Sequence, residues 1–180
     1  MASLQGRHAL VTGGGRGIGR AIAAALTEAG AAVTITGRNE KALADVTGQG
    51  EAAGYVIADV TDANAVDSSI KQAVAARGPV DLLIANAGTA TALPFAKTTP
   101  DHFRNMFDVH VLGMLHPLQA VLGGMTERGF GRVVAIASIV GLKGYPNVSP
   151  YSTAKHAMAF TGCGRPESGS ISSPSHQAVR

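Results

Sequence analysis

The chain has 180 residues, enough for one domain with a substantial core, and 46% of them are hydrophobic. Its formal net charge is +3 and its 15 basic residues are scattered, a pattern that does not indicate a nucleic-acid partner. A single cysteine excludes an intramolecular disulfide framework and a cysteine-built metal site, and no apolar run reaches the roughly 18 residues of a membrane-spanning helix.

Short apolar runs alternate with segments of helical periodicity from the N-terminus onward. The N-terminal stretch has no long apolar run after a basic segment, so we expect no signal peptide and a cytoplasmic protein without membrane association. The first predicted pairs are strand 8–12 with helix 18–29, strand 31–36 with helix 40–46, and strand 54–60 with a helix that Asp62 caps and that runs to about Arg77.

The second half of the chain continues the same alternation. It predicts strand 80–88 with a long helix from about 101 to 126, and strand 131–138 with helix 149–161. Pro117 lies inside the long helix and predicts a kink there. Strand–helix alternation of this kind predicts an α/β fold, a three-layer doubly wound parallel sheet of about five strands.

The glycine-rich stretch TGGGRGIG, Thr12–Gly19, lies between the first predicted strand and the first predicted helix. Glycines there permit a tight turn, let a phosphate approach the backbone, and leave N–H groups free at the positive end of the helix. Ile18 takes the last glycine position of the strict G-x-G-x-x-G pattern, whereas Gly13, Gly17 and Gly19 fit G-x-x-x-G-x-G. The alternative is a turn that only tightens the strand–helix junction. The predicted contacts to a dinucleotide are Gly13, Gly15, Arg16, Gly17, Ile18 and Gly19.

The end of the second strand bears on which dinucleotide binds. An acidic residue there usually binds the adenosine ribose, whereas an arginine accommodates a 2′-phosphate. The sequence TITGRNE places Gly37 and Arg38 at this point without an acid at the strand's end, and Arg16 is a second cation in the same region. NADP(H) is therefore favoured and NAD(H) remains possible. The alternative is that both arginines are ordinary solvated side chains.

Five stretches together resemble the short-chain dehydrogenase/reductase family, in that family's order from residue 6 to about 162. They are TGGGRGIG, ADV at 58–60, NAG at 86–88, GRVVAIAS ending at Ser138, and Tyr151-x-x-x-Lys155. The resemblance implies a Rossmann-type dinucleotide-binding domain over residues 1–162. It also implies a carbonyl reductase or secondary-alcohol dehydrogenase for a small-molecule substrate, assembled as a homo-oligomer through the helices predicted at 101–126 and 149–161.

Tyr151 and Lys155 are one helical turn apart, so their side chains leave the same face of the helix. A free tyrosine phenol has a pKa near 10, and a neighbouring ammonium favours the phenolate. The resemblance implies that Tyr151 is the general acid in reduction and the base in oxidation, that Lys155 bonds the nicotinamide ribose, and that Ser138 holds the substrate oxygen. The alternative is that Tyr151 and Lys155 are only neighbours on a helix surface.

The resemblance also implies roles for residues at the ends of the third and fourth predicted strands. It implies that Asp59 and Val60 border the adenine and that Asn86, Ala87 and Gly88 line the cofactor cleft, although a strand-end turn would have the same composition.

His110 matches the position of a family asparagine that helps to hold a water for a proton relay to the lysine. A histidine can exchange hydrogen bonds with water, and its charge is more sensitive to pH than an amide. The alternative is a buried histidine that only fills space.

The composition changes after about residue 162, where Ser, Pro, Gly and Arg replace the Ala/Val/Ile pattern. We predict an irregular tail over residues 163–180, and a truncation or frame shift relative to family members that continue through further strands. The sheet would then be incomplete at its C-terminal edge. A second functional hypothesis follows, a catalytically inactive nucleotide-binding remnant that associates with full-length relatives.

Overall fold

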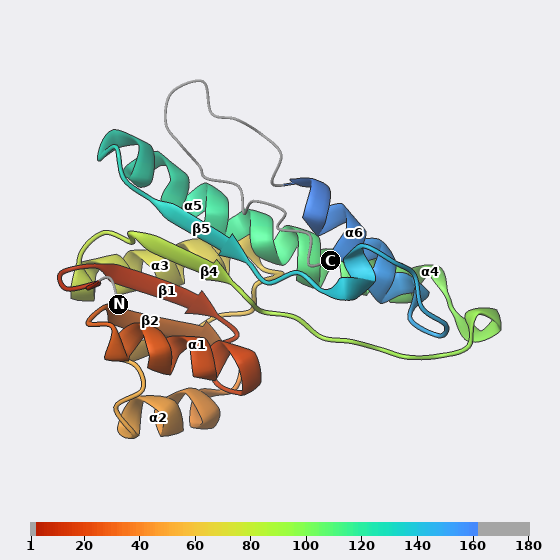
Figure 1. Cartoon of the computed structure of the whole chain (residues 1–180), viewed down its shortest axis with the longest axis horizontal. Helices are drawn as coiled ribbons and strands as arrows, with labels where there is room; N and C mark the ends of the chain where they lie inside the picture. The colour runs from red at the N-terminus through yellow and green to blue at the C-terminus, as the bar shows by residue number, and fades with distance from the viewer. Residues whose placement is uncertain (1–2, 162–180) are drawn as a thin grey trace, which may run out of the picture.

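The computed structural model describes residues 3–161, so the predicted tail at 163–180 lies outside the described residues (Figure 1). The strands are β1 (His8–Thr12), β2 (Ala32–Gly37), β3 (Gly54–Ile57), β4 (Leu82–Ala85) and β5 (Arg132–Ala135). The α-helices are α1 (Gly17–Glu28), α2 (Glu40–Gly48), α3 (Ala63–Arg77), α4 (Pro100–Phe107), α5 (Gly113–Glu127) and α6 (Ser149–Thr161). Short 3-10 helices occupy Phe95–Lys97 and Ile139–Gly141, and a π-helical segment occupies Asp108–Leu112.

The strands form a parallel sheet of five strands in the order β3-β2-β1-β4-β5. Val11 at the centre of the sheet is opposite Ile35 of β2 on one side and Ile84 of β4 on the other. The chain proceeds from β1 to β3 in one direction and then returns to place β4 on the other side of β1. This reversal is the position at which doubly wound sheets bind ligands, beyond the carboxyl ends of the strands. The predicted fold class is confirmed.

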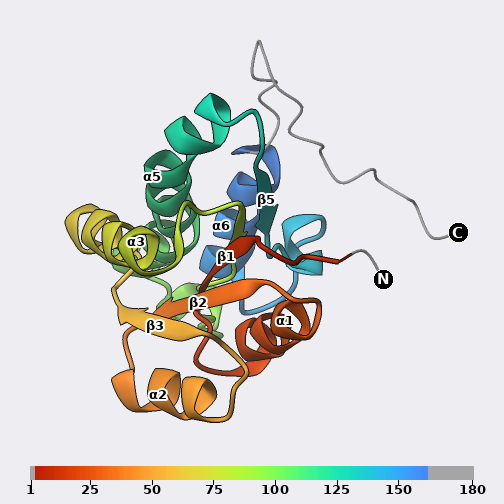
Figure 2. The same cartoon turned by 90° about the vertical axis from the view of Figure 1, so that its left-hand side faces the viewer.

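Helices cover both faces of the sheet (Figure 2). The β1 side chains alternate, so that Ala9 and Val11 pack toward α1 and α2 whereas Leu10 packs toward α3 and α5. The core on the first face also includes Ala23, Val33, Ile35, Leu43, Val46 and Ile84. The core on the second face includes Val66, Ile70, Ala73, Leu83, Val121 and Met125. Asp62 caps α3 as predicted, because its carboxylate accepts hydrogen bonds from the N–H groups of Asn64 and Ala65.

Strands β3, β4 and β5 are shorter than predicted, mainly at the carboxyl end of the sheet, and β4 and β5 also begin at Leu82 and Arg132 rather than at 80 and 131. Strand β3 ends at Ile57 rather than residue 60 because its neighbour β2 ends at Gly37, the partner of Ile57. Strands β4 and β5 last pair at Ala85 and Ala135, and the residues that follow, Asn86 to Gly88 after β4 and Ile136 and Ala137 after β5, line a cleft. The hydrophobic pattern continues past the last paired residue, so it does not mark the point at which pairing stops.

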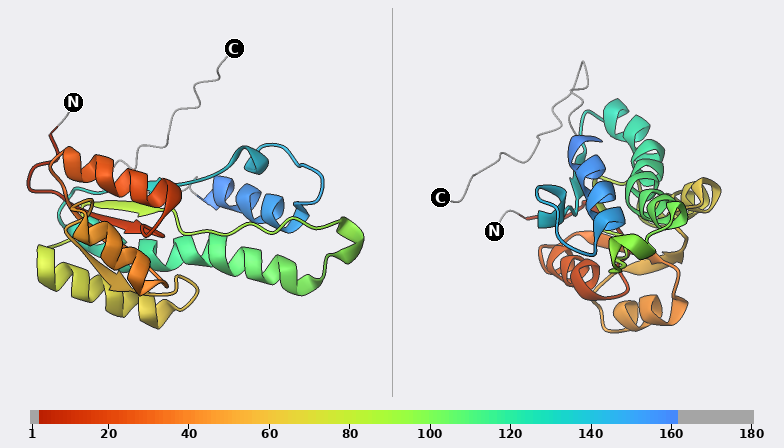
Figure 3. Two further views of the ribbon diagram at one scale, coloured as in Figure 1. Left: turned by 90° about the horizontal axis from the view of Figure 1, so that it is seen from below. Right: turned by 90° about the vertical axis from the view of Figure 1, so that its right-hand side faces the viewer.

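The long helix predicted at 101–126 consists of α4, the π-helical segment and α5. The departure from α-helical hydrogen bonding falls at Asp108–Leu112, before Pro117, which lies inside α5. Helices α4 and α6 lie side by side beyond the carboxyl ends of the strands (Figure 3). No helix in the described range 3–161 is long and apolar enough to cross a membrane.

Strand β5 is at the edge of the described sheet and pairs with β4. Its Val133 packs into the core beneath α3 and α5. Val134 points to the opposite face and is 47% exposed. The two faces of this strand therefore differ, and the face on the α1 side is open to solvent in the described part of the chain.

Candidate functional site

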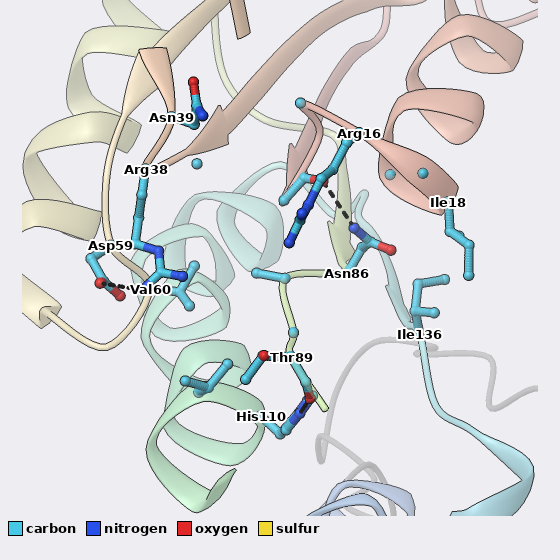
Figure 4. A pocket seen from close by; sticks show the side chains of 18 of the residues that line it. Arg16, Ile18, Arg38, Asn39, Asp59, Val60, Asn86, Thr89, His110 and Ile136 are labelled. Carbon is cyan, nitrogen blue, oxygen red and sulfur yellow. Dashed lines mark hydrogen bonds and ion pairs between the residues drawn. The ribbon is translucent and has the colours of Figure 1, made fainter. Parts of the chain in front are cut away.

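A cleft of about 1140 Å³ lies at the carboxyl ends of the strands, where the strand order reverses (Figure 4). It brings together all of the predicted cofactor-binding residues and three of the four predicted catalytic residues. These are Gly13, Gly15, Arg16, Gly17, Ile18, Gly19, Arg38, Asp59, Val60, Asn86, Ala87, Gly88, His110, Tyr151 and Lys155. The remaining predicted residue, Ser138, does not line the cleft.

The glycine loop needs its glycines for two different reasons. Gly13 and Gly17 have backbone φ angles of +68° and +54°, a conformation that side chains with a Cβ rarely adopt. At Gly19 the constraint is space, because a Cβ would collide with the carbonyl oxygen of Gly13 and the side-chain nitrogen of Asn86. Among residues 3–161 no side chain caps the first turn of α1, so its leading N–H groups and the positive end of its dipole are presented toward the cleft.

Thr12 links the glycine loop to the turn that follows β4. Its hydroxyl oxygen accepts hydrogen bonds from the backbone N–H groups of Asn86 and Ala87, both at 3.0 Å. In return, the Asn86 side-chain amide donates to the carbonyl oxygens of Thr12 at 2.9 Å and Gly13 at 3.3 Å. The sequence did not single out Thr12 as a site residue, because its partners are more than 70 positions away.

The outer end of the cleft carries opposite charges. Arg38 directly follows Gly37 at the end of β2, and its Nη1 lies 3.5 Å from Oδ2 of Asp59, which follows β3. The other carboxylate oxygen of Asp59 accepts hydrogen bonds from the N–H and hydroxyl of Thr61 at 3.0 and 2.9 Å. Burial by itself would raise the pKa of Asp59, but the Thr61 hydrogen bonds and the Arg38 charge together lower it. Asp59 is therefore ionised at neutral pH.

Several residues that the sequence did not predict complete the walls of the cleft. Asn39 is the N-cap of α2 and accepts a hydrogen bond from the Ala42 N–H at 3.0 Å. These additional residues are close in sequence to predicted ones, which is the signal that could have found them. They are Gly37, Asn39, Glu40, Ala42, Leu43, Ala58, Thr89, Ala90, Val109, Ile136 and Ala137.

Tyr151 and Lys155 enter the inner part of the cleft from α6. The ammonium of Lys155 lies 5.9 Å from the centroid of the Tyr151 ring and donates a hydrogen bond to the carbonyl oxygen of Ile136 at 2.8 Å. Lys155 is only 4% exposed, and this burial lowers the pKa of its ammonium to about 8. The structure thus holds a half-buried phenol beside a buried cation that can lose its proton near neutral pH.

His110 lies in the π-helical segment and contacts both Tyr151 and the turn after β4. Its Nε2 is 2.6 Å from the Thr89 carbonyl oxygen, so Nε2 carries the proton and donates it, while the buried Nδ1 has no hydrogen-bond partner among the described residues. The His110 and Tyr151 rings meet edge-on with centroids 5.3 Å apart. Burial, and then the positive charge of Lys155, lower the pKa of His110 against the opposing effect of the Thr89 hydrogen bond. The imidazole is therefore neutral.

Gly88 makes room for the His110 ring. A Cβ at Gly88 would lie 2.7 Å from His110 Cε1 and 3.1 Å from Nδ1. Because the ring fills this space, Gly88 and His110 form one packed unit in the cleft wall. Gly88 was predicted to line the cofactor cleft, and this contact gives it a packing role as well.

Ser138 is the N-cap of the 3-10 helix Ile139–Gly141. Its hydroxyl oxygen accepts a hydrogen bond from the Val140 N–H at 3.4 Å. The two residues before it, Ile136 and Ala137, line the cleft. Ser138 is thus at the margin of the cleft, and its contact with a substrate oxygen stays a prediction.

The chemistry of the cleft is divided along its length. One end offers the N–H groups at the start of α1, glycine backbone and two arginines, which suits an anionic, phosphate-bearing ligand. The other end offers a phenol and a buried ammonium, which suits proton transfer to and from oxygen. Because one continuous cleft contains both, a single extended ligand can contact both ends.

Comparison with known proteins gives a consistent result. The family model described as short chain dehydrogenase matches residues 7–167. The chain is 38% identical over 151 residues to 2-dehydro-3-deoxy-L-rhamnonate dehydrogenase (NAD(+)) of Sphingomonas sp. (strain SKA58), covering 83% of this chain and 61% of that protein. It is 36% identical over 166 residues to 3-dehydrosphinganine reductase of Danio rerio, covering 86% of this chain and 49% of that protein.

Two solved structures share the fold at a TM-score of 0.79 each. One is a gluconate 5-dehydrogenase from Burkholderia cenocepacia J2315 in complex with NADP and tartrate, 35% identical, covering 86% of this chain and 62% of that one. The other is an NAD+-bound xylitol dehydrogenase, 37% identical, covering 86% and 61%. The chain therefore spans between 49% and 62% of the length of these relatives.

Proposed function

The chain belongs to the short-chain dehydrogenase family, an oxidoreductase family that uses nicotinamide cofactors, and from this premise we propose that it interconverts a ketone and a secondary alcohol with NADP(H) preferred over NAD(H). The observation that carries the proposal is the shared cleft. In it the N-terminus of α1 and the Tyr151–Lys155 pair face the same space. The proposal applies to a chain that spans about three fifths of the relatives with solved structures, so substrate and turnover are both part of what is proposed.

The residues present fit a dinucleotide. Gly13, Gly17 and Gly19 keep the loop free of side chains, so a pyrophosphate can reach the backbone N–H groups at the start of α1. Asp59 and Val60 would border the adenine, and Asn86 to Gly88 would line the remainder of the nucleotide site. The bound nicotinamide supplies or accepts the hydride.

The protein's own contribution is proton transfer and positioning. Tyr151 would donate its phenolic proton to a carbonyl oxygen in reduction and remove the hydroxyl proton in oxidation. The Lys155 ammonium would stabilise the phenolate and bond the nicotinamide ribose, and Ser138 would hold the substrate oxygen. His110 is neutral and held by Thr89, and its Nδ1 has no hydrogen-bond partner in the described part of the chain. Nδ1 is therefore suited to accept a hydrogen bond from a water rather than to act as an acid.

Preference for NADP(H) is supported by Arg38 and Arg16, which line the cleft. The relatives include one structure with NADP and one with NAD+, so the proposed preference rests on this chain's own residues alone. Changing Arg38 to Asp should weaken NADPH binding more than NADH binding. An equal effect on both nucleotides would reject the assignment.

The test uses the purified chain and the fluorescence of NADPH and NADH in a titration. Binding is expected, followed by oxidation of the bound cofactor with a member of a panel of ketones, and Tyr151→Phe should abolish that oxidation while leaving the dissociation constant within about twofold. Absence of binding by either nucleotide would defeat the proposal.

A second candidate function is nucleotide binding without turnover, in association with longer relatives. The exposure of apolar residues beside β5 favours it, since Ile139 and Leu142 are 66% and 71% exposed. Substrate chemistry needs an enclosure that excludes water, and these residues border open solvent. Binding of NADPH without any Tyr151-dependent oxidation would select this function.

We also propose a homo-oligomer through α4, α5 and α6. Phe107 and Leu122 on α4 and α5 are 44% and 37% exposed, which provides apolar surface on these helices. Size-exclusion chromatography with light scattering should give more than one chain per particle. A monomer at all concentrations tested would reject this part of the proposal.

A further inference from the structure

Arg38 and Asp59 form an ion pair at the outer end of the cleft, with Nη1 and Oδ2 3.5 Å apart (Figure 4). The two residues come from the ends of adjacent strands, β2 and β3, so the sheet itself places them together. Both side chains are accessible to a ligand, at 74% and 38% exposure. A group that binds the Arg38 guanidinium in this position also comes close to Asp59.

The two partners are not held equally. Asp59 is anchored through its second carboxylate oxygen by the N–H and hydroxyl of Thr61. Arg38 reaches Asp59 from a far more exposed position. The positive charge of Arg38 is therefore already partly compensated before an anionic ligand binds, by a carboxylate that Thr61 holds in place.

A 2′-phosphate and a 2′-hydroxyl respond differently to this arrangement. A phosphate needs the guanidinium and is repelled by the carboxylate at the same time, because like charges at close range are unfavourable. A hydroxyl carries no charge, and it can donate a hydrogen bond to a carboxylate. The carboxylate thus opposes the preference that Arg38 produces.

Resting on the proposed function, we infer that Asp59 is a specificity-determining residue that lowers the preference for 2′-phosphorylated nucleotides by occupying Arg38. The preference of this chain is then set by the ion pair rather than by the arginine alone. Arg16, Glu40 and Lys155 are the other Arg, Lys, Asp or Glu residues that line the same cleft, and none of them shares this contact among the described residues.

The experiment measures dissociation constants of the full chain for NADPH and NADH by fluorescence and for 2′,5′-ADP and 5′-AMP by calorimetry. Asp59→Asn keeps the shape of the side chain and an oxygen for Thr61 but removes the charge. Exposed ion pairs contribute up to about 1 kcal/mol, so the NADPH-to-NADH affinity ratio should rise about twofold to fivefold. The ratio of 2′,5′-ADP to 5′-AMP affinity should rise in parallel.

Two further variants decide whether the effect passes through Arg38. In an Arg38→Ala background, Asp59→Asn should raise the affinity ratio by less than it does when Arg38 is present, because only the direct repulsion between the carboxylate and the phosphate remains. Glu40→Gln removes one negative charge from the same cleft and should change the ratio by less than Asp59→Asn does.

Each other outcome overturns the inference. If Asp59→Asn alters the affinity for both nucleotides equally, Asp59 contacts the shared adenosine instead. If its effect on the ratio is just as large without Arg38, Asp59 acts by direct repulsion only. An equal effect of Glu40→Gln would show a general field effect. If the unmodified chain binds none of the four compounds, the proposed function itself fails, which is a different result from binding with an unchanged ratio.

Discussion

The buried ammonium of Lys155 should make the folded chain less stable than it would be with a neutral side chain of similar size. Lowering the pKa of this group from 10.5 to about 8 means that burial disfavours its charged form. One pKa unit corresponds to about 1.4 kcal/mol, so keeping the ammonium charged in the folded chain lowers the free energy of unfolding by about 3 kcal/mol at neutral pH. The hydrogen bond to the Ile136 carbonyl oxygen returns about 1 kcal/mol.

Lys155→Met should therefore raise the free energy of unfolding by about 2 kcal/mol at pH 7, since methionine fits a similar volume without a charge. The pH dependence has a definite sign. Between about pH 8 and 10.5 the unfolded chain retains the lysine proton and the folded chain releases it, so the stability of the unmodified chain rises with pH. At pH 9.5 the advantage of the variant should be close to zero.

Urea unfolding followed by circular dichroism at pH 7 and 9.5 measures both quantities. Lys97→Met is the matched control, because Lys97 is exposed and its removal should give the same change at both pH values. The reasoning is refuted if Lys155→Met is less stable than the unmodified chain at pH 7, or if the difference between them does not shrink on going to pH 9.5. If the proposed function is correct, the more stable variant will have lost turnover.

Three further predictions concern residues that hold the site or the sheet. Thr12→Val should lower the free energy of unfolding by about 1–3 kcal/mol in urea titrations and weaken nucleotide binding, because the N–H of Asn86 loses its acceptor, whereas Thr12→Ser should restore most of both. Gly88→Ala should destabilise the chain by about 1–3 kcal/mol, because the added Cβ collides with the His110 ring. In a His110→Ala background most of that cost should disappear, and strictly additive effects of the two substitutions would contradict the contact. His8 is buried, and its pKa is lowered mainly by burial, so below about pH 6.5 the unfolded chain gains a proton that the folded chain does not, and the stability of the fold falls as the pH falls. His8→Gln should therefore flatten the decline in melting temperature between pH 7 and 5. An unchanged slope would count against this role of His8.

The sequence by itself determined the order of strands and helices and hence the parallel sheet, because hydrophobic periodicity and glycine stops are local signals. It also placed Gly13, Gly17 and Gly19 in one loop and Tyr151 and Lys155 on one helix face, since these spacings are fixed by the geometry of a turn and of an α-helix. These features survive in the structure because they depend on neighbours within a few residues.

Only the tertiary structure decided which distant groups meet. The hydrogen bond between the Asn86 amide and the Thr12 carbonyl joins residues 74 positions apart, and the Arg38–Asp59 pair exists because β2 and β3 are adjacent in the sheet. The burial that shifts the pKa of Lys155 likewise comes from packing around α6 rather than from its sequence neighbours. The tertiary structure also decides where strands end, since a strand stops pairing where its neighbour stops. A pattern of residues fixes local conformation, but contacts and electrostatic environment follow from how the elements pack.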